Sequence, residues 1–88
     1  MLKISRPEPE NRMAPWKLEG RLVGPWVGEL RQLAEAALAE SRGLALDVSD
    51  VSFVDRQGED LLRDLIARRV RLERPSGFLR ELLDGGQR

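Results

Sequence analysis

The sequence predicts an α/β fold with a mixed four-stranded sheet, in the element order β-β-α-β-α-β-α, with the helices mainly on one face. Three observations support this prediction: alternating segments near the N-terminus, amphipathic segments that follow apolar ones, and an apolar run that begins at Leu44. Strands that alternate with helices are typical of parallel pairing through right-handed crossovers. With 88 residues, the chain is expected to form a single domain over residues 1–88.

The first half of the chain predicts an antiparallel hairpin. Residues 2–5 form a short strand candidate, and prolines make residues 8–11 a turn candidate. Residues 12–23 alternate apolar and charged side chains with the period of a half-buried strand.

A helix is predicted next, over residues 25–41. It begins at Pro25, because proline suits the first helical turn, and it carries one apolar stripe. Gly43 is expected to follow its end in the left-handed conformation.

The second half predicts a central strand at residues 44–54, covered on both faces because its apolar run is nearly continuous. A helix over about residues 56–69 and a strand at residues 70–73 follow. Ser76 is expected to cap a last short helix. The apolar faces of the two helices are predicted to be Leu61, Leu62, Leu65 and Ile66, and Phe78, Leu79, Leu82 and Leu83.

The candidate functional site is the loop and helix start after the central strand: Val54, Asp55, Arg56, Gln57, Gly58 and Glu59. Asp55 is a good N-cap for the N–H of Gln57 or Gly58, and Gly58 lets another backbone or a partner approach closely. Exposed N–H groups at a helix start also suit an anion. Spacing alone favours the structural interpretation, in which Asp55 is a cap and Gly58 a packing glycine.

Other residues admit two interpretations each. Asp47 is either a second carboxylate near Asp55 or, as we favour, an acceptor for nearby backbone N–H groups. Ser49 and Ser52 are phosphorylation candidates or, preferably, turn residues. Trp16 and Trp26 are either interface anchors or core residues. Glu59 and Asp60 either discriminate between partners or supply favourable charge at a helix start. A local basic cluster or a solvated edge is formed by Arg68, Arg69, Arg71 and Arg74.

Composition excludes several kinds of site. The fifteen basic and fifteen acidic side chains cancel, which argues against a nucleic-acid surface. Cysteine and histidine are absent, so disulfides, histidine bases and His/Cys metal sites cannot be built. No apolar run approaches the roughly 20 residues that span a bilayer, and a signal peptide is not apparent. We therefore expect a cytoplasmic protein that does not insert directly into a membrane, and no metal, no cofactor and no enzymatic activity.

Two motifs resemble the STAS domain family, which includes anti-sigma factor antagonists and domains attached to sulfate transporters. Residues 44–62 resemble its signature of an apolar strand with an aspartate, a short apolar stretch, and Asp-Ser-Ser-Gly opening a helix. Residues 18–22 resemble the glycine-containing motif of its second strand, and the likeness extends over roughly residues 13–83.

The resemblance implies a protein-interaction domain of bacterial signal transduction and transcription regulation, whose partner is an anti-sigma factor or a kinase-like ATPase. In the family, the residue after the loop aspartate is a phosphorylated serine or threonine, whereas here it is Arg56, which a serine kinase cannot modify. The expectation is an antagonist or scaffold without that switch. The alternatives are a soluble accessory subunit that docks on a transporter component, and a small-ligand or nucleotide binder.

Overall fold

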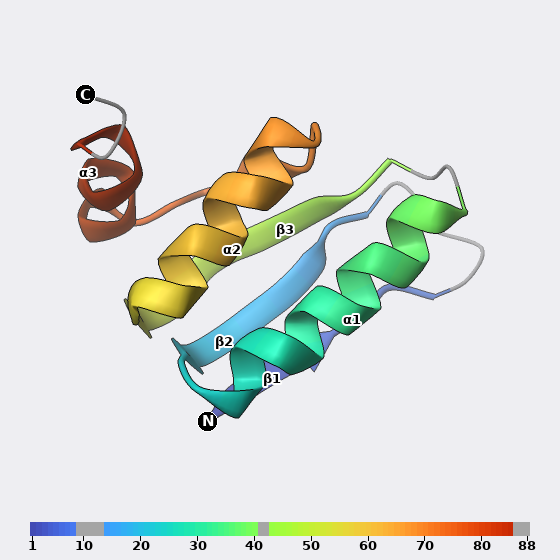
Figure 1. The fold of residues 1–88 in the computed structure, drawn as a ribbon, viewed down its shortest axis with the longest axis horizontal. Helices are drawn as coiled ribbons and strands as arrows, with labels where there is room; N and C mark the ends of the chain where they lie inside the picture. Colours follow the sequence, from blue (N-terminus) through green and yellow to red (C-terminus); the bar gives the residue numbers. More distant parts are fainter. Residues whose placement is uncertain (9–13, 41–42, 86–88) are drawn as a thin grey trace.

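The computed structural model describes residues 1–8, 14–40 and 43–85 and contains four strands and three helices (Figure 1). The α/β class and the mixed four-stranded sheet are confirmed. The elements follow one another as β1 (Leu2–Ser5), β2 (Trp16–Leu22), α1 (Pro25–Ala39), β3 (Ala45–Val54), α2 (Arg56–Ala67), β4 (Arg71–Glu73) and α3 (Gly77–Gly85).

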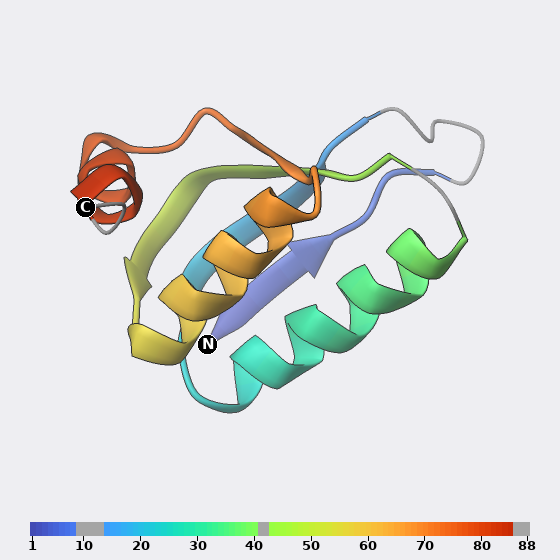
Figure 2. The ribbon, with the colours of Figure 1, turned by 45° about the horizontal axis from the view of Figure 1, so that its top comes forward.

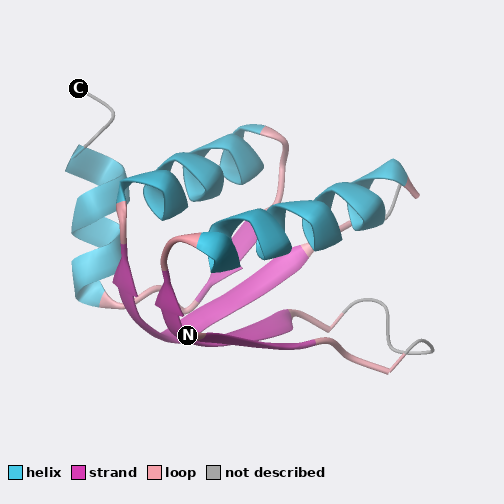
Figure 3. Ribbon diagram, turned by 60° about the horizontal axis from the view of Figure 1, so that its bottom comes forward, coloured by secondary structure: helices cyan, strands magenta, loops and turns pink. Residues whose placement is uncertain are grey.

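The sheet has the order β1-β2-β3-β4, with β1 antiparallel to β2 and the other neighbours parallel. The two crossovers, through α1 and α2, therefore step across the sheet in the same direction. Because crossovers share one handedness, both helices must lie on the same face. Figures 2 and 3 show this arrangement, with α1 and α2 side by side on one face and α3 beside α2.

The core lies between this face and the helices. In β2, buried Leu18 and Leu22 alternate with charged residues that point outward, as in a sheet with one covered face. The prediction that the central strand is covered on both faces is therefore wrong, since all the described helices lie on one face (Figure 3). The largest fully buried side chains come from strands β2 and β3 and all three helices: Leu18, Leu22, Leu30, Leu46, Val48, Leu61, Leu62, Leu65 and Leu79. Burying each side chain contributes about 1.5–3 kcal/mol, so these leucines and valine supply much of the folding free energy.

Two predicted core residues are wrong, because Ile66 and Phe78 are 40% and 44% exposed. Helical periodicity placed each of them at the margin of an apolar stripe. The neighbouring elements cover only the middle of that stripe, which in α2 holds Leu61, Leu62 and Leu65. Val27 is buried in α1, although the apolar stripe predicted for this helix was Trp26, Leu30, Leu33, Ala34, Ala37 and Leu38.

The prediction that Gly43 directly follows the end of α1 is also wrong. The helix ends earlier, at Ala39, and Glu40 caps it with φ −86° while its N–H donates to Ala37 O and Leu38 O. The helix therefore closes on its own carbonyls. The predicted turn at residues 8–11 lies almost entirely outside the described residues.

The predicted turn around Ser49 and Ser52 is wrong as well, because both residues lie within β3. Between the pairs Lys17–Asp47 and Glu19–Asp50, β2 advances by fewer residues than β3, and the register shifts again between Gly20 and Arg21. Each shift inserts an extra β3 residue. The turn-forming sequence is therefore accommodated as irregularities in the strand, which increase its local twist.

A left-handed residue ends α2. Arg69 has φ 75°, while the N–H of Val70 donates to Leu65 O at 2.9 Å, as in a Schellman motif. Only glycine adopts this conformation without a steric cost.

Arg69→Gly is expected to raise the free energy of unfolding by about 0.5–1 kcal/mol, because it removes the steric cost of the left-handed conformation. Urea unfolding measures this change. The matched control is Ala67→Gly in the last helical turn, which should destabilise the protein. Equal losses in both variants would contradict the assigned conformation.

Candidate functional site

The carboxylate of Asp55 joins the starts of two helices. One oxygen accepts from the N–H of Gly58 at 2.8 Å and caps α2, while the other accepts from the N–H of Gly24 at 3.0 Å, at the start of α1. Both backbone donors lower the pKa of Asp55, and the N–H of Gly24 has a larger effect than the N–H of Gly58. The predicted N-cap is confirmed, and its partner is Gly58. The link to Gly24, 31 positions away in the chain, was not predicted.

Gly58 is a packing glycine. A Cβ at this position would lie 2.6 Å from Leu22 O and 2.8 Å from Val54 Cγ1, closer than any side chain tolerates. The N–H of Asp55 also donates to Leu22 O at 3.2 Å, so the loop is fastened to the end of β2. The structural interpretation of Asp55 and Gly58 is therefore correct, and the N–H of Gly58 already has an internal anion.

The predicted site residues divide into an inward and an outward group. Val54 is buried in the core, whereas Arg56 and Gln57 are exposed in the first turn of α2. The side chain of Arg56 is 87% exposed, and its Nε lies 4.0 Å from the carboxylate of Asp60. The fixed loop therefore presents Arg56 and Gln57 outward.

Glu59 is half-buried and pairs with Arg63, which sequence analysis did not single out. Arg63 Nε donates to Glu59 at 3.0 Å, and its Nη1 and Nη2 donate to Leu83 O and Leu82 O at 2.9 and 2.8 Å. Arg63 thus fastens α3 to α2 and satisfies carbonyls near the C-terminal end of α3. Spacing reveals the Glu59–Arg63 pair, but not the contact with α3.

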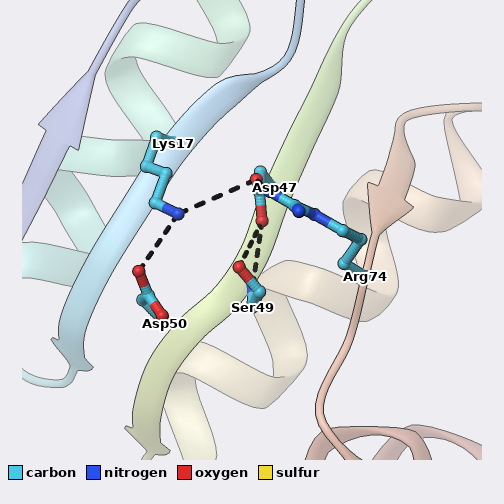
Figure 4. A network of polar contacts seen from close by, with 5 residues as sticks. All are labelled: Lys17, Asp47, Ser49, Asp50 and Arg74. Carbon is cyan, nitrogen blue, oxygen red and sulfur yellow. Dashed lines mark hydrogen bonds and ion pairs between the residues drawn. The ribbon is translucent and has the colours of Figure 1, made fainter.

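A second polar network lies on the sheet face that the helices leave uncovered (Figure 4). Asp47 is only 5% exposed, and it accepts from the N–H and hydroxyl of Ser49 at 3.0 and 2.8 Å. Arg74 binds its other oxygen, and Lys17 lies 3.9 Å from that oxygen and 3.0 Å from Asp50. Arg74 and then the Ser49 N–H hold the pKa of Asp47 far below its usual range.

These contacts confirm that Asp47 accepts a nearby backbone N–H. The ion pairs with Lys17 and Arg74 were not predicted. Asp47 and Asp55 bind different partners near different ends of β3, so they do not form a carboxylate pair. In the described part of the chain, no buried side-chain nitrogen or oxygen is without a hydrogen-bond partner.

The arginines near the end of α2 do not form a free basic cluster. Arg68 binds both oxygens of Glu35 in α1 at 2.7 and 2.9 Å, and Arg71 pairs with Glu73 at 3.5 Å. Since Arg74 binds Asp47, three of the four pair with separate carboxylates. Of the two tryptophans, Trp16 belongs to the core and Trp26 packs against it.

A hollow of about 600 Å³ lies at the opposite end of the sheet from the Asp55 loop. Trp16, Leu33 and Leu44 contribute apolar lining, and the guanidinium of Arg6 lies 5.8 Å from the Trp16 ring centroid. No loop residue from Val54 to Glu59 lines it. Among the described residues there is no group of three or more acidic side chains that would hold a metal ion, and no helix long and apolar enough to cross a membrane.

Comparison with known proteins gives no match: no protein-family model, curated protein or solved structure is similar to this chain at a significant level.

Gly58→Ala is expected to lower the free energy of unfolding by about 1–3 kcal/mol, because the added methyl group overlaps the carbonyl of Leu22. Gly28→Ala is the matched control near the start of α1, where a Cβ meets nothing within 4 Å. It should raise stability by about 0.5–1 kcal/mol. Chemical denaturation compares the two, and a neutral Gly58→Ala would contradict the close packing.

Asp47→Asn tests the network on the open sheet face. Because the pKa of Asp47 is lowered in the folded state, its carboxylate stabilises the fold above its unfolded pKa of about 3.9, and this stabilisation is lost as the pH falls through the folded pKa. The variant should lose about 2 kcal/mol near pH 7, the contribution of a charged hydrogen bond, and less near pH 3.

The control is Asp50→Asn, which removes a 55% exposed carboxylate from the same network. Such pairs contribute little, so stability should change by less than about 1 kcal/mol. A loss in Asp47→Asn that is equally large at both pH values would show that the charge of Asp47 is not what stabilises the fold.

Proposed function

We propose that this chain is a non-enzymatic, STAS-like protein-interaction domain that binds a regulatory protein through the loop from Val54 to Gly58 and the start of α2. It acts as an anti-sigma factor antagonist or a signalling scaffold, and it does so without the serine switch of that family. Its partner is an anti-sigma factor or a kinase-like ATPase.

The observation that carries this proposal is that two residues of the loop make internal contacts while the two between them are exposed to solvent. Asp55 and Gly58 are committed to internal contacts, which hold the backbone at the ends of β2 and β3. Arg56 and Gln57, between them, face solvent from a fixed backbone. Side chains presented in this way lose little backbone entropy when they contact a partner.

Two further features favour a protein partner over a small ligand. Ligands of open α/β sheets bind where the strand order reverses, and the order β1-β2-β3-β4 contains no such reversal. The N–H of Gly58, one of the donors that an anion would use at this helix start, is occupied by Asp55.

Arg56→Glu is expected to weaken partner capture at least about tenfold, because it reverses the charge of a loop side chain that is 87% exposed. The test is a pull-down from native lysate with wild-type protein beside this variant, with captured proteins identified by mass spectrometry. Arg80→Glu, an exposed substitution on α3, is the control and should capture as wild type does.

Loop-dependent capture of a kinase-like ATPase or a sigma-pathway protein is the expected result. Loop-dependent capture of transporter components would instead favour an accessory transporter subunit. Equal capture by all three proteins would overturn the assigned surface. Circular dichroism verifies that each variant is folded.

A further inference from the structure

A row of exposed side chains lies next to the Asp55 loop, with members in β2, in β3 and directly before β1. Met1, Arg21 and Phe53 stand side by side, because Arg21 pairs with Phe53 across β2 and β3 and the N–H of Arg21 donates to Met1 O at 2.8 Å. Arg21 and Phe53 each precede a core residue in their strands, and Met1 directly precedes Leu2, the first residue of β1, so all three point to the sheet face that carries none of the described helices.

Two of the three are unusually exposed for apolar residues. Met1 is 81% and Phe53 43% exposed, and they are two of the four large hydrophobic residues exposed in the described part of the chain. The Arg21 guanidinium lies over the Phe53 ring, 5.2 Å from its centroid, and Arg21 itself remains exposed. Stacking on the ring orients the arginine without neutralising its charge.

The row is continuous with the proposed docking loop. Phe53 lies three positions before Arg56, and the hydrogen bond from the Asp55 N–H to Leu22 O fixes the backbone between row and loop. Arg21 in β2 and Arg56 in the first turn of α2 are both exposed, so positive charges are available in the row and in the loop.

We propose that the Met1–Arg21–Phe53 row extends the docking surface onto the open sheet face and takes a partner segment in which acidic residues flank an apolar one. The apolar side chain packs on Phe53 and Met1, and the carboxylates pair with Arg21 and Arg56. This inference rests on the proposed function, because it assigns the chemistry of the partner at the same end of the molecule.

The charges nearby favour a protein segment over an anionic membrane. Glu19 and Asp50 lie on the same sheet face as the row, and Asp50 pairs with Lys17. A face that binds an anionic membrane binds more strongly with each added positive charge. This face carries charges of both signs, which suits a protein segment whose charged residues pair with individual side chains.

The test selects random peptides displayed on phage against the immobilised wild-type protein and measures the affinity of enriched peptides for variants. We expect enriched sequences to combine Asp or Glu with an apolar residue. Arg21→Glu and Phe53→Ala should each raise the Kd at least about tenfold. Arg71→Glu, an exposed substitution on β4 near the other end of the sheet, is the control and should leave the Kd unchanged.

Arg56→Glu separates this inference from the proposed function. If Arg56→Glu weakens binding while Arg21→Glu and Phe53→Ala do not, the loop binds partners but the row does not. If only the row variants weaken binding, the row stands and the assigned loop does not. Failure to enrich acidic–apolar peptides would overturn the row, as would Arg21-dependent sedimentation with phosphatidylserine vesicles in place of peptide binding.

Discussion

The carboxylate of Asp55 is the contact on which the end of the sheet depends. It satisfies one backbone N–H at the start of each main helix, and these donors are 34 positions apart in the chain, at Gly24 and Gly58. A single side chain thereby fixes the distance between the starts of α1 and α2. Gly58 then brings α2 against the carbonyl of Leu22, so the loop has little freedom to change shape. The motif from Asp55 to Gly58, which looks like a functional site in the sequence, therefore has a structural role first: it holds the starts of both helices at the end of the sheet.

The internal contacts of Asp55 and Gly58 also explain which chemical groups remain available to bind a partner. The backbone donors and the aspartate are used internally, and the exposed surface at this end consists of side chains: Arg56, Gln57, Arg21 and Phe53. The sheet face away from α1 and α2 carries none of the described helices, yet Asp47 is buried there because Lys17 and Arg74 lie against it. Long charged side chains can shield a surface with their aliphatic stems, so Lys17 and Arg74 protect Asp47 on a face that a second layer of helices would cover in a larger α/β protein.

Local patterns in the sequence predicted the elements, while contacts between distant residues remained hidden. The N-cap at Asp55 and the acceptor role of Asp47 toward Ser49 involve neighbours within three positions, and both were predictable. The bonds from Asp55 to Gly24, from Asp47 to Arg74 and from Arg63 to α3 depend on the packing of whole elements. Periodicity likewise identified apolar stripes, but the exposure of Ile66 and Phe78 depends on how far their neighbours reach.

Arg63 has a consequence for how this chain tolerates change. Arg63 donates hydrogen bonds to the main-chain carbonyls of Leu82 and Leu83, and these carbonyls are present whatever side chains the two positions carry. The hydrogen bonds therefore place no demand on sequence at the end of α3, where apolar replacements are required by the buried Leu79 and Leu83 and by Leu82, which packs against the core. Substitutions should accumulate freely on the outer side of this helix, whereas Arg63 and Glu59 would be expected to change together or not at all.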